Sequence, residues 1–205
     1  MTLAAFLAVA AAHLLAAISP GPSFVLSVRT AASEGLRSAV GLAVGFGLCA
    51  AVWAVAALVG LSVLFELAPI LFTVLKVVGG LFLVWIAVAM WRHAPEPMPT
   101  PEPGATPRGF GSAVRLGFLA MVANPKPAVF FGAVFVGLVP GGATATAKAV
   151  VILNVFLVET AWYVAVARIF SLARARRGYA RWKTTLDRAL GAALGALGVR
   201  LAVLP

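Results

Sequence analysis

Six apolar stretches, each long enough to cross a lipid bilayer, constrain the fold of this chain more than any other feature. They lie at 3–28, 38–62, 68–91, 113–138, 149–170 and 186–204. A helix needs roughly 20 apolar residues to span the hydrocarbon core, and it satisfies its own backbone polar groups there. Only 11% of the 205 residues are charged, against about 25% in ordinary soluble domains. The sequence therefore predicts an all-α integral membrane protein with six transmembrane helices.

The basic residues are distributed unevenly among the connections between these stretches. The first, third and fifth connections hold Arg29, Arg37, Arg92, Arg108, Arg115, Arg168, Arg174, Arg176, Arg177, Arg181, Lys183 and Arg188. The opposite side holds Lys76, Lys148 and Arg200. Cytoplasmic loops are enriched in Lys and Arg, so we expect the odd-numbered connections in the cytoplasm and both termini outside. The net charge of +10 thus indicates topology and not nucleic-acid binding, although segment 174–183 also suits anionic lipid headgroups.

A proline-rich segment divides the chain into two groups of three predicted helices. The stretch "HAPEPMPTPEPGATP", His93 to Pro107, contains six prolines and two glutamates among small residues, a composition typical of an extended linker. We therefore expect a first three-helix repeat at 1–92, a cytoplasmic linker at 93–111 and a second three-helix repeat at 112–205.

The two groups carry matching helix breakers in their first helices. Pro20-Gly21-Pro22 in "SPGPSFV" and Pro125-Lys126-Pro127 in "NPKPAVF" lie 105 residues apart. Proline lacks a backbone N–H and clashes with the preceding turn, so each motif should break its helix. Because each unit has an odd number of spans, the second copy should enter the membrane in the opposite orientation. Broken helices at matching places in two inverted repeats indicate a transporter site, whereas the alternative is a pair of kinks that serve packing alone.

Two ionisable residues, Lys126 and Glu159, fall near the middle of the bilayer. Counted from the nearest basic residues at about 1.5 Å per residue, they lie roughly 14–17 Å from an interface. A charge at that depth is costly and usually faces the protein interior or water. We expect Glu159 to carry a coupling proton, and the alternative is a structural ion pair between Glu159 and Lys126.

Four segments together resemble the LysE/RhtB family of amino-acid exporters. They are "SPGPSFVLSVRTAASEGLRSAVGLAVG", "LKVVGGLFLVWIAVAMWR", "NPKPAVFF" and "LDRALGAALGALGVRLAV". The resemblance implies six helices in a bacterial cytoplasmic (inner) membrane and the efflux of a small amino acid or a related metabolite. It also implies that the proton gradient drives export.

An amino acid could be bound by the broken helices. Half-helix N-termini after Pro22 and Pro127, together with Lys126, would meet its carboxylate. Glu159 and the carbonyl groups before the breaks would meet its ammonium group. The expected substrate-binding residues are Ser19, Pro20, Gly21, Pro22, Asn124, Pro125, Lys126, Pro127 and Trp162, with Glu159 as the proton-coupling residue.

Other functions have less support in the sequence. The chain has a single cysteine, Cys49, and two histidines, His13 and His93, and it contains no nucleophile, base and orienting residue in a recognisable set. We therefore expect neither an enzyme nor a cofactor. We interpret His13 as a buried neutral side chain bonded to a neighbour; the alternative is a proton relay, because His13 lies seven residues before Pro20 on the same helix face. A metal-cation exporter of the same superfamily and a non-transporting assembly protein remain alternatives. Glycine faces at 41–45 and 191–195 suit close helix packing, within the chain or across a homodimer.

Overall fold

The computed structural model describes residues 1–67, 69–97, 106–135, 138–139 and 142–203. Throughout these ranges the regular secondary structure is helical, which confirms the all-α prediction. The elements are α1 (Leu3–Ile18), α2 (Pro22–Ser33), α3 (Leu36–Leu67), α4 (Pro69–His93), α5 (Phe110–Val122), α6 (Pro125–Val129), the π-helix η1 (Phe130–Phe135), α8 (Ala145–Ser171) and α9 (Ala173–Val203).

The first apolar stretch forms two helices that are bent by 60° relative to each other. Helix α1 ends at Ile18, Ser19 adopts an extended conformation as its C-cap, and α2 begins at Pro22. Proline is tolerated in the first turn of a helix, because the N–H groups there have no intrahelical partner. The chain therefore leaves one helix before Pro20 and starts the next at Pro22.

The fourth apolar stretch is divided in a similar way. Helix α5 ends at Val122, and Asn124 caps α6, whose first residue is Pro125. The chain then continues as η1, in which the hydrogen bonds follow the wider π-helical pattern. Such π-helical turns are rare and occur often at functional sites.

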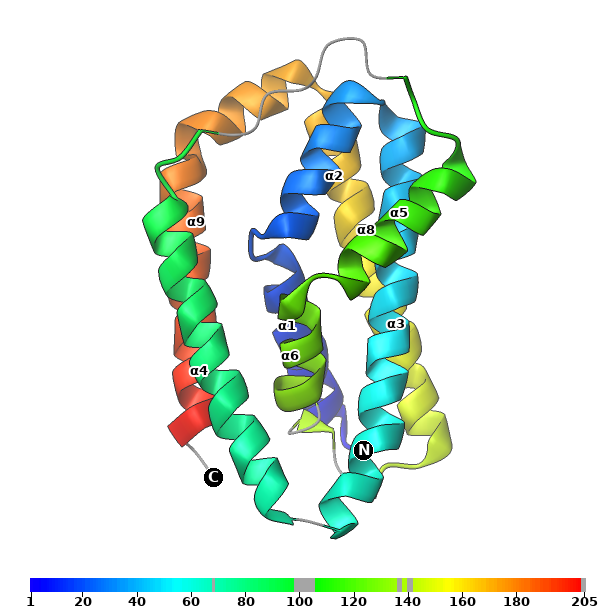
Figure 1. Cartoon of the computed structure of the whole chain (residues 1–205), viewed down its shortest axis with the longest axis vertical. Helices are drawn as coiled ribbons and strands as arrows, with labels where there is room; N and C mark the ends of the chain where they lie inside the picture. Colours follow the sequence, from blue (N-terminus) through cyan, green and yellow to red (C-terminus); the bar gives the residue numbers. More distant parts are fainter. Residues whose placement is uncertain (68, 98–105, 136–137, 140–141, 204–205) are drawn as a thin grey trace.

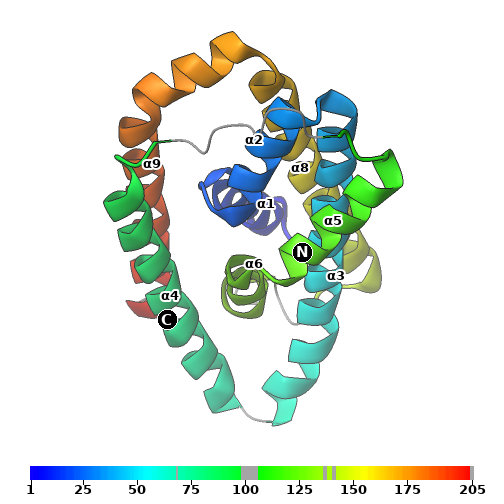
Figure 2. The ribbon, with the colours of Figure 1, turned by 45° about the horizontal axis from the view of Figure 1, so that its top comes forward.

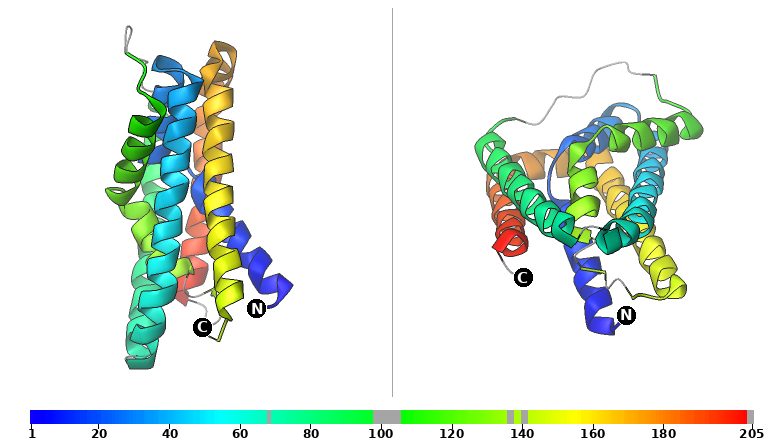
Figure 3. Two further views of the ribbon diagram at one scale, coloured as in Figure 1. Left: turned by 90° about the vertical axis from the view of Figure 1, so that its right-hand side faces the viewer. Right: turned by 60° about the horizontal axis from the view of Figure 1, so that its bottom comes forward.

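The interrupted helices occupy the middle of the molecule (Figures 1 and 2). Helix α4 packs along α9 on one side, and α3 packs against α5 and α8 on the other. Between these two groups lie α1, α2, α6 and η1. The start of α1 projects away from the other helices (Figure 3), and Leu3 and Leu7 there are 73% and 55% exposed. The breaks in both halves of the chain are thus surrounded by continuous helices.

Glycines allow α3 to pack on α5, and α4 on α9, with their backbones in direct contact. A Cβ atom on Gly41 would lie 2.7 Å from the carbonyl oxygen of Phe110 in α5, and Gly45 meets the backbone of α5 one turn later. A Cβ atom on Gly80 of α4 would lie 2.6 Å from the carbonyl oxygen of Gly198 in α9, and Gly191 also faces α4. Both glycine faces that the sequence suggested are therefore covered within the chain.

The connection between α8 and α9 differs from the predicted loop. Only Leu172 separates the two helices, and segment 174–183 forms the first turns of α9. Alanine, arginine and lysine are strong helix formers, so the charges that end the apolar stretch do not end the helix. By length and composition, the Leu36–Val59 part of α3 and the whole of α8 suffice to cross a membrane, and the bent pair α1–α2 gives a third such span.

Candidate functional site

The two helix breaks lie against each other and are joined by side chains. The ammonium group of Lys126, at the start of α6, donates a hydrogen bond to the carbonyl oxygen of Ser19 over 2.7 Å. This carbonyl belongs to the C-cap of α1, at the partially negative end of that helix. The lysine side chain passes beside Gly21, where a Cβ atom would lie 3.8 Å from Cδ of Lys126, an ordinary van der Waals contact. A cation from one half of the chain thus occupies the helix end created by the break in the other half.

Asn124 forms a second joint between the breaks. Its Oδ1 accepts a hydrogen bond from the backbone N–H of Lys126 at 3.1 Å, which caps α6. Its Nδ2 donates to Oγ of Ser23 in α2 over 3.0 Å. The Ser23 hydroxyl in turn donates to Sδ of Met121 at 3.6 Å. Both Asn124 and Ser23 are buried, so the joint is shielded from solvent.

Glu159 lies on the inner face of α8 and pairs with a histidine. Its Oε2 is 3.1 Å from Nε2 of His13 in α1, and both residues are buried, with 3% and 2% exposed. The imidazole ring packs against Phe130 and Phe131 of η1, with ring centroids 5.8 and 5.7 Å away. Within the described part of the chain, Nδ1 of His13 has no hydrogen-bond partner. The pair joins α1 of the first half to α8 of the second.

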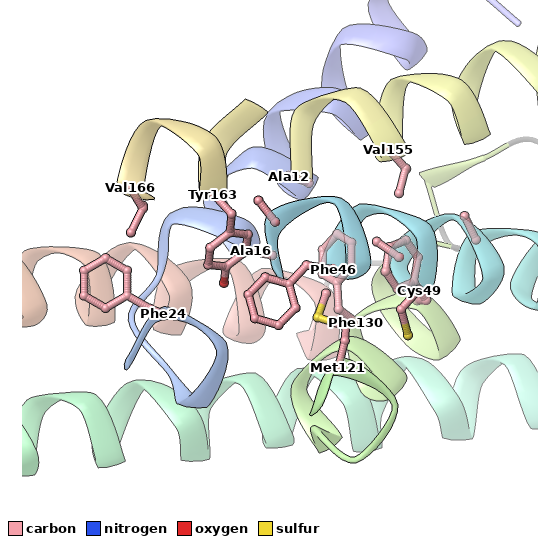
Figure 4. Close-up of a cluster of buried hydrophobic side chains, with 14 of the residues drawn as sticks. Ala12, Ala16, Phe24, Phe46, Cys49, Met121, Phe130, Val155, Tyr163 and Val166 are labelled. Carbon is pink, nitrogen blue, oxygen red and sulfur yellow. The ribbon is translucent and has the colours of Figure 1, made fainter. Parts of the chain in front are cut away.

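A cavity of about 30 Å³, large enough for water, lies beside this pair. His13, Glu159 and Tyr163 line one part of it, and Gly21 and Lys126 line another. Aromatic side chains from several helices converge in this region (Figure 4), where the rings of Phe46 and Tyr163 lie 4.6 Å apart. The buried carboxylate and the bound lysine therefore line the same small cavity.

A second cavity of about 430 Å³ connects the breaks with one end of the molecule. Gly21, Asn124 and Lys126 line both cavities. Its walls come from α2, α4 and the start of α9, and they include Phe24, Trp85, Met90, Tyr179, His93 and Glu96. The side chains of His93 and Glu96 are 66% and 64% exposed, so the cavity reaches the surface there. Its volume is within the range of small-molecule sites.

Polar contacts fix the start of α9 beside the outer part of this cavity. Lys183 forms an ion pair of 2.8 Å with Asp187 and donates a hydrogen bond to the carbonyl oxygen of Ala94 at 3.1 Å. The Tyr179 hydroxyl donates to Asp187 over 2.8 Å. Burial and the neighbouring Asp187 carboxylate raise the pKa of Tyr179, so its phenol stays protonated and acts as the donor. These contacts attach the basic first turns of α9 to the end of α4.

The sequence of the whole bundle matches one protein family. The sequence model of the family described as LysE type translocator matches residues 14–204, a range that includes both breaks and Glu159. The chain belongs to the LysE family.

Several curated relatives of this LysE-family chain carry functional names. It is 36% identical over 201 residues to the threonine efflux protein of Escherichia coli strain K12, which covers 97% of each chain. The threonine efflux protein of Salmonella typhi is 32% identical over 200 residues, again with 97% of each chain covered. The leucine efflux protein of Enterobacter sp. strain 638 is 26% identical over 135 residues, which cover 65% of this chain and 63% of the relative. No solved structure matches the LysE-family chain.

Most of the site residues that the sequence predicts for this LysE-family chain lie at the two helix breaks. Ser19, Pro20, Gly21 and Pro22 form the first break, and Asn124 to Pro127 form the second, with Glu159 on the small cavity. Trp162 packs with the apolar core and lines neither cavity. Buried residues recur every three to four positions along α8, at Val155, Glu159, Tyr163 and Val166, so Tyr163 lies on the same helix face as Glu159.

The sequence interpretation did not nominate Ser23, Tyr163 or the two phenylalanines of η1 as site residues, and it gave His13 only a minor role. Two signals point to some of them in hindsight. Ser23 follows the first Pro-x-Pro motif directly, and Tyr163 lies four residues after Glu159, a spacing that places two side chains on one helix face. The joining of His13 to Glu159 has no such signal, because it depends on how α1 and α8 are rotated against each other.

Proposed function

We propose that this LysE-family protein exports a small amino acid or a closely related metabolite from the bacterial cytoplasm, in exchange for protons. The relatives named as threonine and leucine efflux proteins support this substrate class. The observation that carries the proposal is the meeting of two helix breaks, from the two halves of the chain, beside the buried carboxylate of Glu159.

The proposal includes six spans formed by two inverted repeats. The third helices of the two halves, α4 and α9, pack along each other, and so do the second helices, α3 and α8. The breaks between α1 and α2 and between α5 and α6 also meet. Such pairing of equivalent elements is what two repeats with opposite orientation would give.

The larger cavity suits loading from the cytoplasm. The end of α2, the start of α3, the end of α4 and the start of α9 lie at one end of the molecule (Figure 1), and these segments carry most of the basic residues. By the positive-inside rule this end faces the cytoplasm, and the starts of α1 and α4 face outside. The cavity reaches the surface at that same end, so the structure has the form expected of an inward-facing state.

A zwitterion finds complementary groups where the cavity meets the breaks. The N-terminus of α2 and the ammonium group of Lys126 suit its carboxylate. The Ser19 carbonyl oxygen already accepts a hydrogen bond from an ammonium group, that of Lys126, so the substrate's ammonium group would take an equivalent place. Apolar groups such as Phe24 and Met90 line the cavity and suit a short aliphatic side chain.

The experiment is transport in liposomes that contain the purified protein. The wild-type chain should exchange labelled threonine or leucine between the two sides at equal pH, and a pH gradient should drive net accumulation. Glu159→Gln keeps the size of the side chain but does not titrate, so exchange should persist while accumulation fails. Glu34→Gln is the matched control, because that carboxylate pairs with Arg108 at a site that lines neither cavity.

A double variant separates proton coupling from structural pairing. If Glu159 only neutralised Lys126, then Glu159→Gln combined with Lys126→Met should restore gradient-driven accumulation, because no buried charge is left unpaired. Recovery in the double variant would overturn the coupling role of Glu159. Failure of the wild-type chain to move any member of an amino-acid panel would overturn the transport proposal itself.

A further inference from the structure

His13 has an unused acceptor atom next to a carboxylate. An ionised carboxylate only accepts hydrogen bonds, so the 3.1 Å contact with Glu159 requires a proton on Nε2 of His13. A neutral imidazole then has its lone pair on Nδ1. That atom is buried and has no partner among the described residues, although buried polar atoms are nearly always satisfied. The ring lines the small cavity beside the breaks.

From this arrangement we infer that Nδ1 of His13 is the binding site of the coupling proton, and that Glu159 stays ionised and holds the imidazolium in place. This inference rests on the proposed function, and it assigns the coupling proton to the imidazole of His13; Glu159, which the Glu159→Gln experiment tests as the proton carrier, is here the anion that holds the protonated ring. Imidazole is the more basic of the two groups in water, and the existing contact to Nε2 strengthens when the ring becomes charged. A protonated Nδ1 would donate to water in the small cavity that the ring lines.

The other titratable groups around His13 fit this assignment. Lys126 of α6 and Tyr163 of α8 line the same cavity, and Cys49 of α3 is a buried free thiol. The Lys126 ammonium group donates to the Ser19 carbonyl oxygen over 2.7 Å, whereas the Glu159 carboxylate contacts the imidazole of His13. The flanking η1 residues, Phe130 and Phe131, carry no charge.

Exchange follows from competition for one carboxylate. With the proton on His13, the ion pair with Glu159 is electrically neutral. When a zwitterionic substrate enters the space beside Lys126, its carboxylate faces that lysine, and its ammonium group competes with the imidazolium of His13 for the single carboxylate of Glu159. The proton then leaves Nδ1 for water in the small cavity and passes to the larger cavity along their shared wall. Substrate and proton thereby bind in turn, as antiport requires.

The first test uses His13→Gln, since the glutamine amide can donate to Glu159 but does not titrate. For one-to-one exchange, a gradient of one pH unit drives about tenfold accumulation, because each unit is worth about 1.36 kcal/mol. We expect this variant to give no accumulation under the gradient, and its exchange, measured at equal pH on both sides, to lose the pH dependence of wild-type exchange. Accumulation equal to that of the wild type would overturn the inference and leave the proposed function intact.

The second test leaves His13 and Glu159 unchanged. The chain has two histidines, so in His93→Gln all ring signals from ¹⁵N-labelled histidine in detergent belong to His13. As the pH falls, Nδ1 should move from the unprotonated to the protonated range, and saturating threonine or leucine should shift that transition to lower pH. A ring that stays neutral while proton-driven transport continues would overturn the inference, as would a transition that substrate does not move.

Discussion

Replacing Asn124 with alanine tests whether its side chain joins the two helix breaks. The substitution removes the N-cap of α6, made by Oδ1 with the N–H of Lys126 at 3.1 Å. It also removes the 3.0 Å hydrogen bond from Nδ2 to Ser23 of α2. Loss of an N-cap costs about 1 kcal/mol, and hydrogen bonds between membrane helices average about 0.6 kcal/mol. We expect the free energy of unfolding to fall by roughly 1.5–2 kcal/mol.

A matched control separates the stability lost with the N-cap from the stability lost with the hydrogen bond between Asn124 and Ser23. Thr144 caps α8 by accepting a hydrogen bond from the N–H of Ala147 at 3.2 Å, at an exposed site with no second partner among the described residues. Thr144→Ala should therefore cost only the cap, about 1 kcal/mol. Unfolding of the purified protein in mixed micelles, titrated with a denaturing detergent, measures both variants against the wild type.

A double-mutant cycle gives the refuting result. Ser23→Ala and Asn124→Ala, singly and together, should show a coupling energy of about 0.6 kcal/mol, with an upper limit near 1.7 kcal/mol. Additive effects would show that the two side chains do not support each other, and the interpretation of Asn124 as a joint would be wrong. We also expect exchange of threonine or leucine to slow in both single variants, because the breaks would no longer be held in one geometry.

Two further predictions concern packing and topology. Gly80→Ala should destabilise the protein by about 1–3 kcal/mol, since the added Cβ atom would lie 2.6 Å from the carbonyl oxygen of Gly198. Gly178→Ala is the control, because its added Cβ atom would meet nothing within 4 Å, and it should stabilise α9 by up to about 1 kcal/mol. A cysteine placed at Ser112 in a Cys49→Ala background should react in intact cells only with membrane-permeant thiol reagents, and labelling by an impermeant reagent from outside would contradict the cytoplasmic placement of the linker.

The helix ends at the breaks follow from local chemistry and were therefore accessible from the sequence. Proline has no backbone N–H to donate, whatever surrounds it, and the described helices end before Pro20 and Pro125. The helical start of α9 was not recognised, because the apolar pattern gives way to charges at residue 174 while helix propensity continues. Most of the Pro-rich linker, at 98–105, lies outside the described residues.

Which side chains contact one another at the candidate site could not be predicted from the sequence. Glu159 and Lys126 were expected at similar depth, but depth does not determine which groups meet. The rotation of α1 brings His13 to Glu159, whereas Lys126 extends to the backbone of Ser19. The sequence predicts a site residue at Trp162, three residues beyond Glu159, whereas the face of α8 that lines the cavity continues at the fourth residue, Tyr163.

The contact between α4 and α9 has a mechanical consequence. Their backbones meet at Gly80 and Gly198 without an intervening layer of side chains, so the two helices have little freedom to slide or separate. One helix comes from each half of the chain, and only Leu172 lies between α9 and α8. We expect α4 and α9 to move together as one rigid unit that rotates about a point near Leu172. A tilt that closes the wall of the larger cavity on one side of the membrane would then loosen the helix packing on the other side.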